Sequence, residues 1–408
     1  MGILTSMFTA VSGLNAYGNA MGIIGNNIAN VGTAGFKGSR PAFADLVSSS
    51  LVGASGSSQG LGVFLADVQG VFTQGSLTTT GQTLDMAIDG NGFFEVRDAS
   101  GAQFFTRNGQ FKLDRQGQVI DATGNLLQGY QATSAGVLTN TIGNITLQTS
   151  NISPRATTQA AITANLNSAA TVPTGAFNAA DPTTYNFSTS TTIFDSLGNS
   201  HNLQLFFVKS ATANTWAVHQ RLDTGATAAI AGGVTFTTAG ALATGGTQNL
   251  SLTMPGGAAT PQAVTVTLSG LTQYAAQSAL LSQSQDGFTS GALAGFGIDS
   301  TGQVTAQYTN GRNLLLAQVA LSRFPNPQGL DRDGKNLFVE TTDSGTSVQG
   351  APGNNGLGHV ISGAIERSNV DLGEQFVDMI ITQRAFQANS RAITTSDEML
   401  QELVNLKR

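Results

Sequence analysis

The residues that could catalyse a reaction or bind a metal ion are few in this sequence, and their spacing suits neither task. Residues 56–60, GSSQG, fit the Gly-x-Ser-x-Gly pattern, in which the serine, here Ser58, is a nucleophile held between a strand and a helix. The surrounding SSSLVGASGSSQG has neither element, so we expect a flexible loop. The available bases are His201, His219 and His359, and none stands near a carboxylate in a recognisable motif.

Two groups of acidic residues could suggest a cation site, but turns explain both. Asp331 and Asp333 precede a glycine, yet a calcium-binding EF-hand loop needs its glycine at position six and a glutamate at position twelve. Asp85, Asp89 and Asn91 stand among glycines and are typical of a β-turn that leads into a strand. We therefore predict a protein that is not an enzyme and has no catalytic, cofactor-binding or metal-binding residues.

Composition excludes further classes of function. The chain has 408 residues, no cysteine, 18 basic and 24 acidic side chains, and only 10% charged residues. Disulfides and thiolate metal sites are therefore excluded, and a net charge of -6 with no clustered Lys and Arg argues against nucleic acid as a partner. A hydrophobic fraction of 40% over this length predicts several domains with real cores.

The N-terminal segment is apolar but interrupted. Its first charged side chain is Lys37, and Asn, Gly, Ser and Thr recur every few positions. No stretch of about 20 apolar residues exists, so we expect neither a cleaved Sec signal nor insertion into a membrane. An uncharged surface of this length predicts contact with protein.

Apolar residues at the N-terminus recur at alternating spacings of four and three, which predicts a helix with a heptad seam. The seam consists of Ile3, Met7, Ala10, Leu14, Tyr17, Met21, Ile24, Ile28 and Val31. Glycines inside this helix weaken it by about 1 kcal/mol each relative to alanine. Gly18, Gly25 and Gly32 are seven residues apart, so we expect a smooth line that another backbone could approach closely.

The C-terminus predicts a second helix, of about 35 residues. Its apolar repeat has a strict period of seven: Ile365, Leu372, Met379, Phe386, Ile393 and Leu400. Asp371, with Glu374 three residues later, is typical of a helix start. The two seams could bury a core within one molecule or serve the assembly of subunits. Their position at both chain ends favours assembly, because isolated termini tend to fray.

Between the helices the apolar pattern alternates with period two, which predicts antiparallel strands joined by glycine-bearing turns. A first run covers residues 93–122 and a second covers residues 297–340, and we expect them to share one β-domain. From about Gln148 to Gln285 the chain is rich in Thr, Ala, Ser and Gly but keeps strand patterns, so we expect an inserted β-domain.

The chain is thus expected to be mainly β with terminal α-helices, nested in order. The predicted parts are a terminal helical domain (1–32 and 364–408), a connecting segment (33–70), a β-rich middle domain (71–147 and 286–363) and an inserted β-rich domain (148–285).

Three blocks resemble the bacterial flagellar axial proteins, the rod and hook family. They are residues 7–37, 84–96 and 368–406, and TRNGQFKLDRQGQVIDATGNLLQGY (106–130), together with the length and the insertion, is most similar to the hook branch. The matching signature positions are Asn26, Asn27, Ile28, Ala29, Asn30, Gly35, Phe36, Asp89, Gly90, Gly92 and Phe93. The inserted segment shows no recognisable signature.

The resemblance implies a structural subunit, without cofactor, that polymerises into a curved hollow tube acting as a universal joint for torque. It implies terminal helices as a coiled-coil-like inner layer, the inserted domain outermost, and export through the flagellar type III apparatus to the cell exterior. Implied partners are further copies of the chain, the distal rod, the hook cap and the hook-filament junction proteins. A rod subunit and, from another class, a β-rich surface adhesin are the alternatives.

Overall fold

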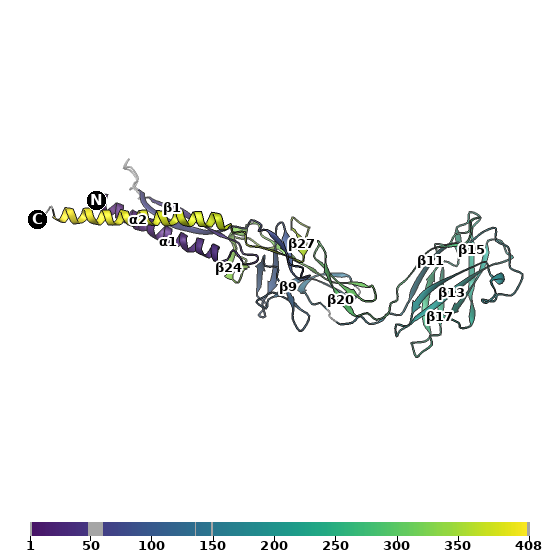
Figure 1. The fold of residues 1–408 in the computed structure, drawn as a ribbon. Helices are drawn as coiled ribbons and strands as arrows, with labels where there is room; N and C mark the ends of the chain where they lie inside the picture. The colour runs from purple at the N-terminus through teal and green to yellow at the C-terminus, as the bar shows by residue number, and fades with distance from the viewer. Residues whose placement is uncertain (1, 48–59, 135, 148–149, 406–408) are drawn as a thin grey trace. The chain divides into compact units, whose positions relative to one another are not determined.

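The structure is a computed structural model that describes residues 2–47, 60–134, 136–147 and 150–405 (Figure 1). Ser58 of the Gly-x-Ser-x-Gly motif lies outside these residues. The chain forms two compact units, one of Met1–Thr149, Gly295–Ala306 and Asn313–Arg408, the other of Ser150–Ala294 and Gln307–Arg312. The predicted fold class, mainly β with interacting terminal helices, is confirmed. The terminal helices and the β-rich middle part fall within the same unit.

The two terminal helices form where the apolar periodicity predicts them. Helix α1 spans Gly2–Ala29 and helix α2 spans Leu372–Asn405. Asp371 caps α2, because its carboxylate accepts hydrogen bonds from the backbone N–H groups of Gly373 and Glu374 at 2.7 and 3.2 Å. Ile365, the first member of the predicted C-terminal repeat, lies in a strand and not in the helix.

The segment expected to connect the helix to the β-domain contains an antiparallel ribbon. Strands β1 (Ser39–Val47) and β2 (Gly60–Gly70) pair with each other. The ribbon packs on α1, where Tyr17 and Phe43 have ring centroids 5.7 Å apart and the N–H of Val63 donates to Ser12 Oγ at 3.1 Å. Phe64 and Phe43 are partly exposed on this ribbon.

The β-rich part of the first unit joins the two strand runs through strand pairing. Strand β9 pairs with β5 and β22, β5 also pairs with β23, and β6 pairs with β25. The strands of the first run therefore do not pair in simple chain order, because β25 from the second run lies beside β6. The strands are β3 (Leu77–Thr79), β4 (Met86–Asp89), β5 (Phe93–Arg97), β6 (Gln103–Thr106), β7 (Lys112–Leu113), β8 (Val119–Ile120), β9 (Leu126–Ala132), β10 (Leu138–Asn144), β20 (Leu293–Ile298), β21 (Gln303–Tyr308), β22 (Asn313–Val319), β23 (Leu321–Arg323), β24 (Asp331–Gly334), β25 (Leu337–Val339), β26 (Val348–Gly350), β27 (His359–Ser362) and β28 (Ala364–Glu366).

One turn sequence, Asp-x-x-Gly, recurs between strands and explains their tight connections. In the turn at Asp121, the carboxylate accepts from the N–H groups of Thr123 and Asn125 at 2.7 and 2.9 Å, and Gly124 has φ +93°. A glycine adopts this left-handed conformation without steric cost. The same bonds from one carboxylate to the second and fourth following residues occur at Asp98, Asp114, Asp195 and Asp299.

The second unit is a β-sandwich with its own core. One sheet has the order β17-β18-β11-β19 and the other β12-β13-β14-β15-β16. Alternating strands such as β17, TQNLSL, bury every second residue, so each sheet contributes one apolar face to a core around Trp216 and Phe207. The strands are β11 (Gln159–Asn165), β12 (Phe187–Phe194), β13 (Ser200–Lys209), β14 (Thr215–Leu222), β15 (Thr227–Phe236), β16 (Leu242–Thr244), β17 (Thr247–Leu252), β18 (Gln262–Thr267) and β19 (Ala279–Gln285).

Candidate assembly surface and its supporting junction

Small and polar side chains of α1 and α2 meet in an antiparallel register. Ser6 Oγ lies 3.4 Å from Ser396 Oγ, and Asn27 Nδ2 donates to Gln375 Oε1 at 2.8 Å. Between these pairs, a Cβ added at Gly13 would lie 2.8 Å from Asn389 Oδ1. The same register places Ala20 beside Thr382, and both are buried. These contacts repeat every seven residues along each helix, and we call them the polar ladder: Ser6–Ser396, Gly13–Asn389, Ala20–Thr382 and Asn27–Gln375.

The predicted apolar seams lie beside the polar ladder and not at its centre. In α1, Ala10 and Ile24 are buried, whereas the half-buried members are Met7, Leu14, Tyr17, Met21 and Ile28. Ile3 belongs to α1 but its side chain falls outside the described set, and Val31 follows the helix and is half-buried. In α2, Leu372 is exposed and the half-buried members are Met379, Phe386, Ile393 and Leu400. The role of both seams in assembly stays a prediction.

Large apolar side chains are exposed on the sides of the two helices that face away from the ladder. We define the distal patch as Leu4, Phe8 and Val11 of α1, near the end of the helix pair that carries both termini. We define the proximal patch as Phe376, Val377, Ile380 and Ile381 of α2, near the β-rich part. Phe8 is 65% exposed and Ile381 is 59% exposed. Clustered exposure of this kind is typical of surfaces that contact another protein.

The predicted glycine line is free within the chain. A Cβ added at Gly25 or Gly32 would have no atom within 4 Å, and one at Gly18 would only approach Phe386 to 3.9 Å. Close approach by another backbone at this line stays a prediction.

Behind the helices, a buried junction binds three distant segments. Lys37 Nζ donates to Glu366 Oε1 at 2.5 Å, and Arg107 Nη1 donates to Glu366 Oε2 at 3.2 Å. The exposed fractions of these side chains are 1%, 0% and 6% for Lys37, Glu366 and Arg107. The N–H of Gly75 also donates to Glu366 Oε1, at 2.7 Å. One carboxylate thus serves two buried cations, and we call this cluster the Lys37–Glu366–Arg107 junction.

The charged states of Lys37 and Arg107 in this junction depend on the carboxylate of Glu366. Burial lowers the pKa of Lys37, while the charge of Glu366 and its hydrogen bond oppose that shift. Burial likewise lowers the pKa of Arg107, again opposed by Glu366. Arg107 Nε is buried without a hydrogen-bond partner, while Nη2 donates to Gly90 O at 2.9 Å. Two positive charges therefore depend on one negative charge, and all three side chains are at most 6% exposed.

Several of the signature residues surround this junction. Gly35, at φ +68°, donates its N–H to Glu366 O at 2.8 Å, and a Cβ there would lie 2.4 Å from Asn108 N. Gly90 supplies the carbonyl bound by Arg107, and the guanidinium of Arg107 lies 5.3 Å from the ring centroid of Phe93. The structure therefore brings together signature residues from the blocks 7–37 and 84–96.

The remaining signature residues shape the end of α1 and the neighbouring turns. Asn27 Oδ1 accepts from Ser39 N and its Nδ2 donates to Ser39 O, and Asn30 Nδ2 donates to Asn26 Oδ1 at 2.7 Å. Phe36 packs under the guanidinium of Arg332, 5.8 Å from its ring centroid. Three others are placed elsewhere around this region: Ile28 and Ala29 in the last turn of α1, and Asp89 opposite His359 on β4 and β27. Gly92 has φ +125° and packs against Leu357.

In the second unit, one histidine contacts two carboxylates, and the sequence analysis did not predict this group. His201 Nδ1 lies 2.8 Å from Asp223 Oδ2, and His201 Nε2 lies 3.3 Å from Asp195 Oδ2. Burial alone would lower the pKa of His201, but its bonds to the two carboxylates raise the pKa above its usual value. The pKa of Asp195 falls to about 2, because bonds from Asn199, His201 and Leu197 outweigh the effect of burial. The Asp-x-x-Gly motif at Asp195 is the sequence signal that could have predicted Asp195 as a neighbour of His201.

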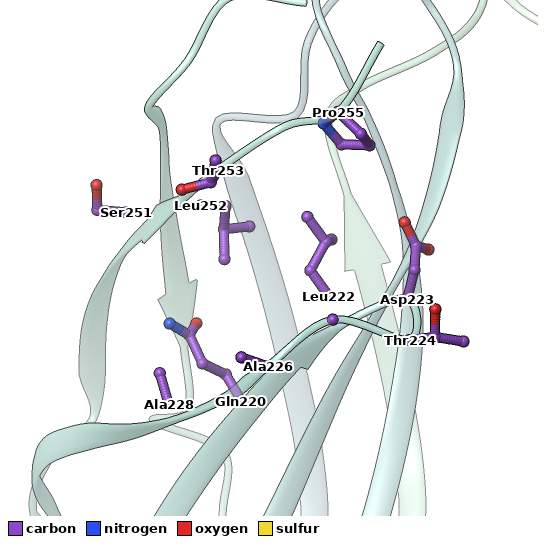
Figure 2. A pocket seen from close by; sticks show the side chains of 11 residues that line it. Gln220, Leu222, Asp223, Thr224, Ala226, Ala228, Ser251, Leu252, Thr253 and Pro255 are labelled. Carbon is purple, nitrogen blue, oxygen red and sulfur yellow. The ribbon is translucent and has the colours of Figure 1, made fainter.

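The second unit also has a surface cavity of about 550 Å³, and Figure 2 shows its lining. Leu222 and Leu252 form apolar walls, and Gln220, Thr253 and Asp223 supply polar atoms. Asp223 is the one ionisable side chain in this lining, and it is engaged by His201 and by Asn202 N. The described lining therefore pairs no nucleophile with a base.

The other candidates for chemistry are dispersed. Asp331 and Asp333 lie exposed on β24, and Asp85 accepts from Thr80 Oγ1 at 2.6 Å. His219 stacks on Phe177 at 4.0 Å between centroids, and burial lowers its pKa. Neither terminal helix, nor any other described helix, combines the length and apolarity that crossing a bilayer requires.

Comparison with known families matches four regions of the chain. They are "Flagella basal body rod protein" (7–37), "Flagellar hook protein FlgE/F/G D1 domain" (87–176), "Flagellar basal body protein FlaE D2 domain" (165–288) and "Flagellar basal body rod FlgEFG protein C-terminal" (361–406). The third match lies in the inserted segment, where the sequence analysis found no signature. That segment therefore does belong to the same group of proteins.

Relatives that match over their full length and one solved structure agree with these family matches. The chain is 37% identical over 410 residues to the flagellar hook protein FlgE of Salmonella typhimurium, covering 98% of this chain and 100% of the relative. It is 34% identical to that of Treponema pallidum, covering 100% of both chains. The crystal structure of Helicobacter pylori flagellar hook protein FlgE2 is similar in fold, with a TM-score of 0.55 at 14% identity, over 72% of this chain and 99% of that chain.

Proposed function

The chain belongs to the flagellar hook protein family and is a structural subunit, not an enzyme, and from this premise we propose how it assembles. Copies of the chain associate through their terminal helices into the hook, a curved hollow tube that transmits torque. In this tube the terminal helices form the inner layer, the β-rich part of the first unit a middle layer, and the second unit the exposed layer.

The observation that carries this proposal is the exposure of apolar side chains on both helices. The distal and proximal patches point away from the polar ladder, so they cannot bury one another within the chain. Burying a side chain such as Phe376 or Ile380 is worth about 1.5–3 kcal/mol, which makes association favourable. The glycine line at Gly18 and Gly25 would let a helix of another copy approach closely.

Substitution of the proximal patch tests the role of the helices. Phe376→Ser with Ile380→Ser should abolish hooks on flagellated cells, while the purified chain keeps the thermal unfolding of its β-rich parts. Leu197→Ser is the matched control, because Leu197 is 57% exposed in the second unit and should leave hooks intact. Normal hooks from the double variant would contradict the proposal.

Immunogold electron microscopy of intact cells tests the placement of the second unit. Antibody against residues 150–294 should label a short curved segment at the base of each filament. Label found only on extracted basal bodies would favour a rod subunit, and label scattered over the envelope would favour an adhesin.

Family membership also supports a proposal on export and further partners. We propose that the chain leaves the cell through the flagellar type III apparatus, without a cleaved Sec signal, and is located outside the cell. The proposed partners at the ends of the tube are the distal rod, the hook cap and the hook-filament junction proteins. A secretion assay should find the chain in the medium of cells that cannot assemble hooks but have an intact export apparatus, and only inside export-deficient cells.

A further inference from the structure

Asparagine followed by glycine is the dipeptide in which a side chain reacts most readily with its own backbone. The glycine nitrogen attacks the amide carbon of the asparagine, and glycine has no side chain to obstruct the approach. The chain contains four such pairs: Asn91-Gly92, Asn108-Gly109, Asn310-Gly311 and Asn355-Gly356. The structure distinguishes these pairs by burial and by hydrogen bonding.

Burial holds two of the pairs in place. Gly92 and Gly109 are both buried. A Cβ placed on Gly109 would overlap Met86 O, and one placed on Gly92 would lie 3.2 Å from Leu357 Cδ2. The nitrogen of each glycine therefore cannot move toward the preceding side chain without disturbing the packing around it.

Hydrogen bonds hold the third pair in place. Asn310 Nδ2 donates to Thr289 O at 2.7 Å, and Asn310 Oδ1 accepts from Arg312 N at 3.1 Å. The nitrogen of Gly311, which is the attacking atom, donates to Tyr308 O at 2.9 Å. Reaction at this pair must first break these bonds.

The fourth pair lacks both restraints. Asn355 and Gly356, at φ +52° and +74°, are the central residues of an exposed type I′ turn, which the N–H of Leu357 closes by donating to Asn354 O at 2.9 Å. Within the described part of the chain, neither the side chain of Asn355 nor the nitrogen of Gly356 forms a hydrogen bond. A Cβ placed on Gly356 would approach a single described atom within 4 Å, Arg323 Nη1 at 3.8 Å.

We propose that Asn355 converts spontaneously to aspartate and isoaspartate in the folded chain. The deprotonated nitrogen of Gly356 attacks Asn355 Cγ, the side-chain nitrogen leaves as ammonia, and a cyclic succinimide remains. Water then opens this ring at either carbonyl. The net reaction consumes water, replaces the amide by a carboxylate and releases ammonium, without oxidation and without a cofactor. Opening at one carbonyl gives aspartate, and opening at the other gives isoaspartate, whose main chain runs through the former side chain.

The charge of Arg323 favours this reaction. Its guanidinium borders the turn and forms no ion pair among the residues that the structure describes. A positive charge at this place stabilises the negative charge on the attacking nitrogen of Gly356. After the reaction, the same guanidinium can pair with the new carboxylate.

The conversion changes the packing beside the turn. Leu357 is 5% exposed and packs on Gly92, and the N–H of Gly358 donates to Asn91 O at 2.7 Å. Isoaspartate lengthens the main chain within the turn, so the turn can no longer hold Leu357 and Gly358 in both contacts. Because no enzyme is needed, the converted fraction rises with the age of the chain.

Peptide mapping tests the proposal, because trypsin places the four pairs in four different peptides. The purified full-length chain is incubated in mildly alkaline buffer, and mass spectrometry follows the replacement of amide by acid in each peptide. We expect Asn355 to convert first, about tenfold or more faster than Asn310, whose hydrogen bonds must break before it reacts. In denaturant, where burial and these bonds are lost, all four pairs should convert at similar rates. Equal rates in the folded chain, or faster conversion of another pair, would overturn the proposal.

Two variants complete the test, which does not depend on whether the chain forms hooks. Asn355→Gln should stop conversion at this position and leave the other three pairs unchanged, because the longer side chain forms a ring far less readily. Enzymatic methylation of isoaspartate should then label the aged natural chain more strongly than the aged variant, and equal labelling would contradict the site. Arg323→Gln should slow conversion at Asn355 by about 1.5- to 5-fold, the range that an exposed charge provides. An unchanged rate would overturn the role of Arg323.

Discussion

Replacing Glu366 by glutamine should loosen the first unit severely. The side chain is fully buried and holds Lys37 Nζ at 2.5 Å and Arg107 Nη1 at 3.2 Å, so Glu366→Gln leaves two buried cations without a counter-charge. Removing one partner of a buried ion pair typically costs about 3–5 kcal/mol. For a unit of this size that corresponds to a fall in melting temperature of about 6–20 °C. Thermal unfolding of the purified full chain, followed by circular dichroism, measures it.

Two comparisons make the reasoning refutable. Lys37→Met leaves Glu366 paired with Arg107 alone, so its loss should be less than half that of Glu366→Gln. Arg155→Ala breaks an ion pair whose side chains are 57% and 25% exposed, and should cost about 0–1 kcal/mol. A melting temperature for Glu366→Gln within about 2 °C of the natural chain would refute the charge argument, as would a larger loss from Lys37→Met.

Three further results are expected. Gly13→Ala should push Asn389 out of the polar ladder and speed amide hydrogen exchange in α1, and adding Asn389→Ala should restore protection; equal exchange in both variants would contradict the ladder. His201 has a raised pKa, so its stabilisation of the second unit is present below about pH 6.5 and lost as pH rises through that pKa; melting between pH 5.5 and 9 should show this slope, and His201→Asn should remove it. Limited proteolysis of the free monomer should trim both helices, about 30 to 70 residues at the N-terminus and about 40 at the C-terminus, with the β core resistant; protected ends would argue against ordering on assembly.

Sequence periodicity predicted the elements well because local patterns determine them. The run FFEVR forms strand β5 with the predicted bounds, although its first four residues are all buried and do not alternate. Asp371 marked the start of α2 because a cap acts within one turn. Which side of a helix meets its neighbour could not be predicted in this way. In α2 the apolar repeat at Met379 and the polar repeat at Thr382 have the same period of seven, so spacing alone cannot choose between them.

Clusters of residues that lie far apart in the sequence could not be predicted, for another reason. Glu366 stands 329 residues from Lys37 and 259 from Arg107, and no local pattern links them. His201 and Asp223 meet only because β13 and β14 are neighbours in one sheet. The resemblance indicated Gly35 and Gly90 as signature residues. Their shared contact with the Lys37–Glu366–Arg107 junction is visible only in the structure.

The same junction has a consequence for the order in which the chain folds. A chain delivered from its N-terminus presents Lys37 and then Arg107 long before Glu366 arrives, so the first unit cannot close until nearly the whole chain is available. The second unit has its own core and all its strands between Gln159 and Gln285, so it can fold during that wait. A truncated product that ends before residue 366 would therefore contain the folded β-sandwich. It would lack the Glu366 carboxylate that the first unit needs in order to close beneath the helices.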